Sequence, residues 1–252
     1  ETDGYYTIND FNADDAKHKT WTLKEGVVKI NGYNPQPGDV KFKDLRVDGV
    51  INAGDNTVDN PGDRKVIGND AARYQFGISL GASYKGWSLE VLLQGVGKRD
   101  YWLGGPAMFP FGGAGAGDAV FQALYANQTD YWRAKSYDPS SSDYMVPVNP
   151  DSKLFRIYDQ GNNVGSNTRV SDKYLQNAAY MRIKNITLAY TLSKEWVRRA
   201  FIQDAKFYLS IENLATFSSL PKGYDPEGTA PSSTANALSN GISWGYPYYR
   251  TI

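Results

Sequence analysis

The sequence of 252 residues contains no cysteine and a single histidine, His18. The absence of cysteine excludes a disulfide scaffold, a thiolate metal site and a cysteine nucleophile. One histidine excludes a multi-histidine zinc site and argues against a histidine-based catalytic triad. The formal net charge is zero, from 27 Lys plus Arg and 27 Asp plus Glu. The sequence therefore lacks the basic excess typical of a nucleic-acid-binding domain.

Long apolar runs are also missing. No run of apolar residues reaches the roughly 18 that a transmembrane helix needs. The sequence starts at Glu1 without a charged and then apolar leader, so we expect any signal peptide to have been removed or to lie outside this chain. Aromatic residues, in contrast, make up 14% of the chain, although the mean hydropathy is −0.53. A transmembrane strand needs only ~9–11 residues of alternating character. The alternation pattern therefore decides whether this chain is a soluble protein or one that crosses a membrane with strands.

Alternation with a period of two begins at Arg73. Every second residue from 74 to 84 is apolar, and the residues between them are small or polar. After the turn dipeptide Lys85-Gly86, apolar residues again take every second position from 87 to 93. Two such runs joined by a tight turn predict a β-hairpin over residues 74–96.

The length of these strands favours a position in a membrane. Twelve alternating residues exceed the ~5–6 that are usual in globular strands. Tyr84 and Trp87 flank the turn, as expected for an aromatic girdle at a membrane interface. The alternative is a soluble antiparallel sheet with one solvated face.

The same pattern predicts two further strands, at residues 178–191 and 206–213. Ser193 is a suitable N-cap for a short helical turn between them. An extended segment, the start of a last strand, begins at residues 248–252. Together with the hairpin and the loops between them, these strands make residues 73–252 the strand-bearing part of the chain.

The remaining segments are long and irregular. Residues 1–72 are polar and rich in turn dipeptides, which predicts an extracellular loop region with short extended pieces. Residues 97–177 and 214–247 are predicted loops as well. Short turns at one end of the strands and long loops at the other are typical of a transmembrane β-barrel. Because so few strands cannot close a barrel and open edges are costly in lipid, we predict an all-β chain that is part of a larger antiparallel barrel.

Several motifs carry a resemblance to a known family. In chain order they are Gly38–Leu45 (GDVKFKDL), Asp63–Asn69 (DRKVIGN), Trp87–Arg99 (WSLEVLLQGVGKR), Ser171–Gln176 (SDKYLQ), Tyr180–Tyr190 (YMRIKNITLAY), Tyr208–Leu214 (YLSIENL) and Gly223–Glu227 (GYDPE). These stretches resemble the SusC/RagA family of TonB-dependent outer-membrane transporters of Bacteroidetes. The resemblance covers most of residues 36–252, and residues 1–35 match only loosely.

The resemblance implies the carboxy-terminal part of a 22-stranded barrel with long extracellular loops and short periplasmic turns. The plug domain, the segment that contacts TonB and the closing strand are expected to lie outside this chain. The parent protein would reside in the outer membrane of a Gram-negative bacterium and import oligosaccharides or peptides. Its implied partners are a SusD-like surface lipoprotein, the TonB complex and the lipid bilayer, with no nucleic acid.

Aromatic residues in the predicted outward loops are the candidate site. Flat rings there could stack on sugar faces or contact the lipoprotein, and the alternative is that they pack the loops on one another. The candidates for contact with substrate or lid are Tyr101, Trp102, Tyr131, Trp132 and Trp244.

Neither a metal site nor catalysis is expected. Asp44–Asp55 has the acidic spacing and the glycine of a calcium loop, but Arg46 takes the place of an oxygen ligand and no helices flank it. We therefore expect no cofactor, with calcium at this loop as a weak possibility. Asp225 and Glu227 are a carboxylate pair without an apolar wall to raise a pKa, so we expect no enzyme. The alternative function is a soluble, aromatic-rich β-sandwich that binds carbohydrate.

Overall fold

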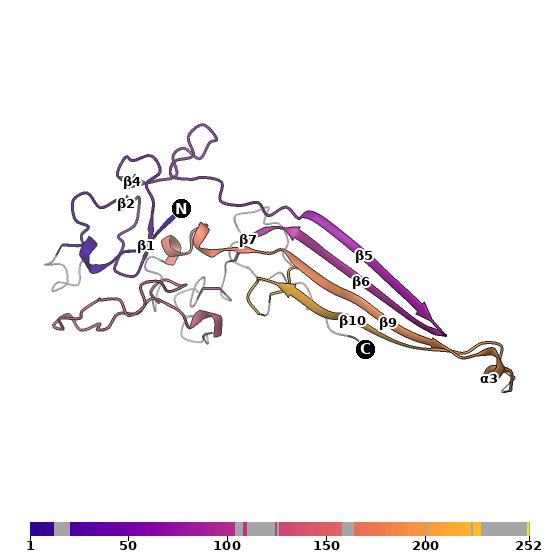
Figure 1. The fold of residues 1–252 in the computed structure, drawn as a ribbon. Helices are drawn as coiled ribbons and strands as arrows, with labels where there is room; N and C mark the ends of the chain where they lie inside the picture. Colours follow the sequence, from indigo (N-terminus) through magenta and orange to yellow (C-terminus); the bar gives the residue numbers. More distant parts are fainter. Residues whose placement is uncertain are drawn as a thin grey trace. The chain divides into compact units, whose positions relative to one another are not determined.

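The computed structural model describes residues 1–12, 21–103, 108–109, 124, 126–157, 164–199, 201–222, 224–227 and 251. The chain divides into two compact units (Figure 1). The first, the aromatic unit, contains Glu1–Gly68 and Trp102–Leu175. The second, the sheet unit, contains Asn69–Tyr101 and continues from Gln176. The units are therefore not the two consecutive segments, 1–72 and 73–252, of the sequence-based division.

The sheet unit is built on four long antiparallel strands in the order β10-β9-β6-β5 (Figure 1). Their bounds are Arg73–Tyr84 for β5, Trp87–Lys98 for β6, Tyr180–Thr191 for β9 and Lys206–Ser218 for β10. The alternating sequence forms these strands because successive side chains point to opposite faces of a sheet. The predicted hairpin and both predicted later strands are confirmed, and β10 extends beyond its predicted end at residue 213.

Two compact connections lie at one end of this sheet. Lys85 and Gly86 join β5 to β6 with φ angles of 46° and 86°, the conformation of a two-residue hairpin turn whose twist matches that of its strands. The helix α3 (Lys194–Arg199) connects β9 to β10. Its first turn is closed by the Ser193 carbonyl, which accepts the N–H groups of residues 196 and 197, so the predicted helical turn is confirmed.

A bulge in β9 keeps the two halves of this strand in phase. Against β6, Asn185 pairs with Leu92 and Ile183 pairs with Leu93, which leaves Lys184 unpaired. A shift of one residue moves side chains to the other face of a sheet. The extra residue therefore allows Ile183 and Ile186, three positions apart, to lie on the same face.

Among its described residues, the aromatic unit has only short elements. Two strand pairs are present, β1 (Thr2–Tyr5) antiparallel to β3 (Val40–Phe42) and β2 (Lys29–Ile30) parallel to β4 (Val50–Ile51). The short helices are η1 (Ile8–Asp10), η3 (Ala126–Gln128), α2 (Val164–Asn167) and η4 (Asp172–Tyr174). The strands β7 (Asp100–Trp102) and β8 (Leu175–Asn177) contain points where the chain passes from one unit to the other. No helix in the described part of the chain is long and apolar enough to cross a membrane.

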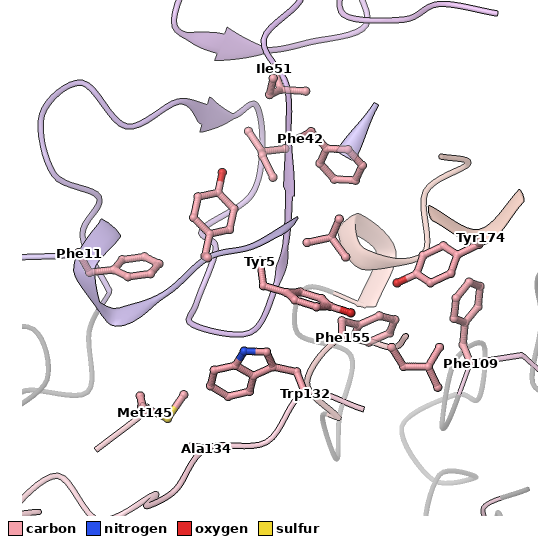
Figure 2. Close-up of a cluster of buried hydrophobic side chains, with 14 residues drawn as sticks. Tyr5, Phe11, Phe42, Ile51, Phe109, Trp132, Ala134, Met145, Phe155 and Tyr174 are labelled. Atoms are coloured by element: carbon pink, nitrogen blue, oxygen red, sulfur yellow. The ribbon is translucent and has the colours of Figure 1, made fainter. Parts of the chain in front are cut away.

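Buried aromatic rings hold the aromatic unit together (Figure 2). Tyr6, Phe11, Trp132, Phe155 and Tyr174 are all at most 1% exposed. They come from both sequence segments of the unit, so the predicted surface loops pack on one another around a common core. A buried polar pair adds to this core, because the Asn167 amide donates to Asp39 at 2.7 Å and accepts the Val40 N–H at 2.7 Å.

Gly38 lies directly against the Trp132 ring. Its φ of +93° is a conformation that side chains disfavour, and a β-carbon there would lie 2.7 Å from both the ring and the Arg156 β-carbon. Gly38→Ala is therefore expected to destabilise the aromatic unit by about 1–3 kcal/mol. Gly26 has a similar φ and open space around it, so Gly26→Ala is the control: it carries the backbone strain of an alanine at positive φ without the steric clash. Thermal unfolding followed by tryptophan fluorescence compares the two variants, and equal losses would contradict the packing argument.

Candidate functional site

One face of the four-stranded sheet is apolar along its whole length, and we call it the apolar face. Residues that pair directly across neighbouring strands share a face, so its members follow from the strand register. We call each row of four residues that pair across β5, β6, β9 and β10 a level. Starting from the turn end of the sheet, the five levels are Tyr84, Trp87, Tyr190 and Phe207; Ala82, Leu89, Leu188 and Leu209; Leu80, Val91, Ile186 and Ile211; Ile78, Leu93, Ile183 and Ala215; and Phe76, Gly95, Met181 and Phe217.

The apolar face is open to the surroundings. Tyr84, Trp87, Phe207 and Phe217 are more than half exposed, and Leu80 is 55% exposed. Exposed apolar surface of this extent marks contact with a partner or a membrane. Aromatic side chains take part in the first and last levels, the arrangement of the two girdles of a transmembrane barrel. Twelve residues at about 3.3 Å each, tilted by about 35–45°, also match a hydrocarbon core of about 30 Å.

The opposite face, the polar face, carries hydrogen-bonded side chains. Asn185 donates to the Ser210 hydroxyl at 3.0 Å, and the Thr187 hydroxyl lies 2.9 Å from that of Ser210 and donates to Asn185 at 2.9 Å. Glu90 and Gln94 lie on the same face, and its apolar members include Leu92, Val96 and Ala189. A sheet with one apolar and one polar face matches the lipid side and the lumen side of a barrel wall.

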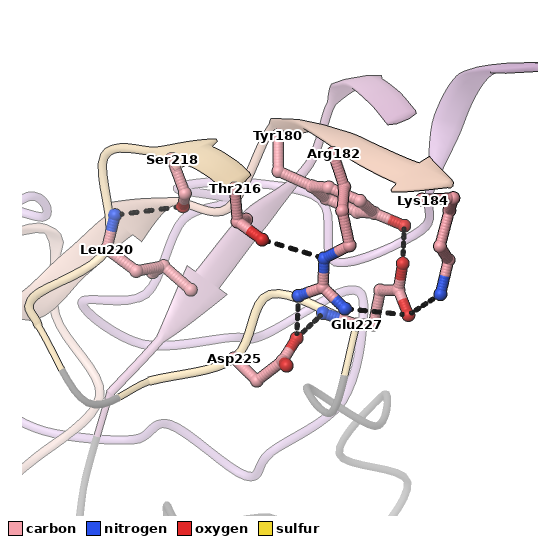
Figure 3. Close-up of polar contacts among 8 residues, drawn as sticks. All are labelled: Tyr180, Arg182, Lys184, Thr216, Ser218, Leu220, Asp225 and Glu227. Carbon is pink, nitrogen blue, oxygen red and sulfur yellow. Dashed lines mark hydrogen bonds and ion pairs between the residues drawn. The ribbon is translucent and has the colours of Figure 1, made fainter. Parts of the chain in front are cut away.

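A buried arginine organises one end of the polar face (Figure 3). The Arg182 side chain is only 3% exposed, and its guanidinium lies 2.7 Å from Asp225 and 3.2 Å from Glu227. Its Nε donates to the Thr216 hydroxyl at 2.8 Å. Lys184, the bulge residue, adds an ion pair to Glu227 at 3.0 Å. This Arg182 network binds the segment 224–227 to the polar face, so the carboxylate pair has a structural role.

The aromatic unit contains a cavity of about 800 Å³. Phe42, Trp102 and Phe109 supply apolar parts of its wall. Its charged lining residues are Glu1, Asp63, Arg64, Lys65 and Arg169. Hydrogen bonds from Lys43 and Lys65 lower the pKa of the Glu1 side chain to about 2, so this carboxylate is ionised and neutralised by the lysines. A pocket with an apolar wall and a few charged groups suits a ligand with both apolar and polar parts.

The structure separates the five candidate aromatic residues. Trp102 is half-buried and lines the cavity, with its ring 6.0 Å from that of Phe109. Tyr131 is half-buried under the Arg133 guanidinium, 5.8 Å from the ring centroid. Trp132 is 0% exposed, so its ring packs the loops together and offers no surface to a ligand. Tyr101 belongs to the sheet unit, where burial raises the pKa of its hydroxyl. Trp244 lies outside the described residues.

The oxygens of the Asp44–Asp55 loop are used within the loop itself. Asp44 accepts the N–H groups of Val47 and Gly49, both at 2.6 Å. Asp55 accepts the N–H and the hydroxyl of Thr57. Over the described ranges, no three acidic, histidine or cysteine side chains gather as a metal site would require. Calcium binding at this loop stays an untested prediction.

Sequence reasoning missed the Arg182 network as a unit. It treated Asp225 and Glu227 as an isolated carboxylate pair and Arg182 as one residue of a strand. The available signal was the position of Arg182, because a charge inside an alternating membrane strand needs a partner on the lumen side. The partner itself could not be read from the pattern.

No protein-family model matches the chain. Among curated proteins, it is 25% identical over 233 residues to TonB-dependent receptor P3 of Formosa agariphila and 22% identical over 236 residues to TonB-dependent receptor P26 of the same organism. These similarities cover 90% and 92% of the chain but 19% and 21% of the relatives. The chain therefore spans about a fifth of the length of the curated relatives that it matches.

Solved structures of one transporter also match. The RagAB peptide transporter is 25% identical with a TM-score of 0.37, and the RagAB peptide importer in its closed-closed state is 24% identical with a TM-score of 0.37. Each match covers 61% of this chain and 14% of the other.

A long antiparallel sheet with one apolar and one polar face is typical of proteins that cross an outer membrane with β-strands. The chain is similar over most of its length to two curated TonB-dependent receptors, and its motifs resemble those of the SusC/RagA family. This relationship places it in the outer membrane of a Gram-negative bacterium. The matched proteins are named as receptors, transporters and importers and not as enzymes.

Proposed function

We propose that this chain forms part of the wall and outward loops of a TonB-dependent outer-membrane importer of nutrients. The single observation that carries the proposal is the sheet whose one face is apolar over all five levels while the other is hydrogen-bonded and charged. The outer edges of β5 and β10 would pair with further strands of a 22-stranded barrel. An edge residue already pairs in this way, since Glu212 of β10 bridges to Thr251.

In the proposed importer the apolar face contacts lipid, so the protein needs detergent or lipid to stay in solution. This requirement can be tested directly. The protein purified in detergent is expected to precipitate when the detergent is removed and to stay monodisperse when it is exchanged into nanodiscs, as measured by size-exclusion chromatography. The alternative, a soluble β-sandwich that binds carbohydrate, needs no detergent. A monodisperse protein without detergent would therefore contradict the importer and support the sandwich.

We infer that the cavity of the aromatic unit is where the nutrient, an oligosaccharide or a peptide, first contacts this chain. Trp102 and Phe109 would present ring surface to it, and the basic residues of the lining would hold its polar groups. A SusD-like lipoprotein would close over the outward loops, and TonB would supply energy through other parts of the protein. The name of the RagAB peptide transporter supports a peptide as one candidate.

Trp102→Ala tests this site. Removing the ring is expected to weaken binding of the substrate by about tenfold, because an aromatic contact of this kind contributes about 1 kcal/mol or more. Tyr137→Ala is the matched control, since Tyr137 is an aromatic residue of the same unit, 55% exposed, and outside the cavity lining. Isothermal titration of the detergent-solubilised protein with panels of oligosaccharides and short peptides measures both. Equal affinities for the two variants would reject the cavity as the contact site.

A further inference from the structure

The connection between β9 and β10 exposes apolar side chains at the turn end of the sheet. Around α3, Val197 is buried, whereas Trp196 is 70%, Phe201 99% and Ile202 49% exposed. These three residues lie within seven positions of one another and next to the first level of the apolar face, which contains Phe207. Figure 1 shows α3 at the tip of the long strands. The connection therefore adds exposed apolar side chains at the turn end of the sheet.

Phe201 occupies a backbone position that favours glycine. The N–H of Ile202 donates to the Val197 carbonyl and that of Phe201 to the Arg198 carbonyl, both at 3.1 Å, which is the paired pattern that ends many helices. In this pattern the residue at position 201 is left-handed, and its φ is 58°. A bulky residue rarely adopts this conformation, and strain of this kind points to a function. Here it holds a phenyl ring that is almost fully exposed.

The charges around these side chains are mainly basic. Residues 194–206 contain four basic and two acidic side chains, and in the sequence a single residue separates Arg198 and Arg199 from the exposed phenylalanine. Lys85, in the neighbouring turn, adds another positive charge at the same end of the sheet. Exposed Trp and Phe beside Arg and Lys are the composition of segments that lie in a membrane interface, where cations meet lipid phosphates.

We propose that residues 194–206 anchor the turn end of the sheet in the phospholipid surface of the membrane. Trp196, Phe201 and Ile202 enter the boundary between headgroups and acyl chains, and Arg198 and Arg199 bind lipid phosphates. The inference rests on the proposed function in one respect, since it requires the apolar face to contact lipid. It adds a second contact with lipid at the end of the sheet where the short turns lie.

Spin labels at single introduced cysteines test the anchor, because these 252 residues contain no other cysteine. The protein is reconstituted in vesicles of phosphatidylcholine and phosphatidylglycerol, and collisions of each label with oxygen and with a water-soluble nickel complex report its depth. Phe201→Cys is the test position. Leu89→Cys, on the apolar face, is the lipid reference, and Val58→Cys, at a residue 96% exposed in the aromatic unit, is the water reference.

The label at position 201 is expected at a depth of about 5–10 Å, with nickel collisions several-fold fewer than at position 58. If label 89 lies in lipid and label 201 collides with nickel as freely as label 58, the anchor is wrong and the importer stands. If the label at position 89 also collides with nickel as freely as the label at position 58, the apolar face is not in lipid. That result would contradict the proposed function itself, and the anchor with it.

A second variant separates anchoring from folding. Phe201→Gly suits the left-handed backbone, so the turn is expected to fold. With a label at Ile202→Cys, removal of the phenyl ring is expected to raise nickel collisions toward the value at position 58. Unchanged collisions after Phe201→Gly would show that the ring holds nothing in the lipid and would overturn its part in the anchor.

Discussion

Val91→Lys is expected to destabilise the protein in a bilayer by about 2–4 kcal/mol, because the residue lies on the middle level of the apolar face. A lysine at this depth must leave the lipid or carry its charge into it. Its neighbours on that level, Leu80 and Ile186, offer no polar group to receive the ammonium. Urea titration of the protein folded in vesicles measures the loss.

The matched control for this variant is Ser79→Lys. Ser79 pairs with Leu92, one position along from Val91, but it lies on the polar face. A lysine there meets a lumen or solvent, so the expected change is within about 1 kcal/mol. Equal losses for the two variants would show that the two faces do not differ in environment. Such a result would remove the main support for a membrane-spanning sheet.

Arg182→Ala is expected to destabilise the sheet unit by about 3–5 kcal/mol, because it leaves two half-buried carboxylates without the buried cation that they share. Glu227 keeps Lys184 at 3.0 Å, whereas Asp225 loses its ion pair at 2.7 Å. The segment 224–227 should then detach from the polar face. Thermal unfolding measures the loss of stability, and limited proteolysis reports whether the segment becomes accessible.

Two further variants identify the cause of that loss. Lys184→Ala removes a cation whose side chain is 21% exposed, and it is expected to cost about 1 kcal/mol or less. The triple variant Arg182→Met, Asp225→Asn, Glu227→Gln removes the charges together and should recover most of the stability, because replacing a whole buried ion pair is often nearly neutral. If the triple variant is as unstable as Arg182→Ala, packing of the arginine and not charge pairing explains the loss.

Alternation made the strands predictable, because the period of side-chain direction in a strand is a local property. Nothing outside residues 73–84 is needed to see that Ile78 and Leu80 face one way and Ser79 the other. The tight turn at Lys85-Gly86 was predictable for the same reason, because a turn dipeptide is also a local signal. The sequence therefore predicted the hairpin and the later strands with their faces.

The bulge at Lys184 was not predictable in the same way. The alternation breaks between Ile183 and Asn185 in the sequence, and only the pairing with Leu92 and Leu93 shows that one residue is extra. The same local break hid the length of β10, which continues past Asn213, a residue with a φ of 51°. Bulges depend on the partner strand, so their position is a property of the sheet.

The aromatic unit shows the largest difference between sequence and structure. Its residues lack a clear period, so Trp132 was a candidate for ligand contact on composition alone. In the fold the Trp132 ring is fully buried against Gly38, a residue distant in the sequence. Trp102, in contrast, lines the cavity. Composition could identify aromatic side chains as important, but it could not separate core from contact surface.

The sequence by itself determined the chemistry that this chain excludes, the strands of the sheet and which side of each strand is apolar. These follow from residue type and from a repeat of two, and both act over a few neighbouring residues. Only the tertiary structure decided that Arg182 pairs with Asp225 and Glu227, that the irregular loops share an aromatic core, and that Phe201 is held exposed at the turn end. Each of these depends on residues brought together from distant or non-repeating parts of the chain, where sequence spacing carries no information about contact.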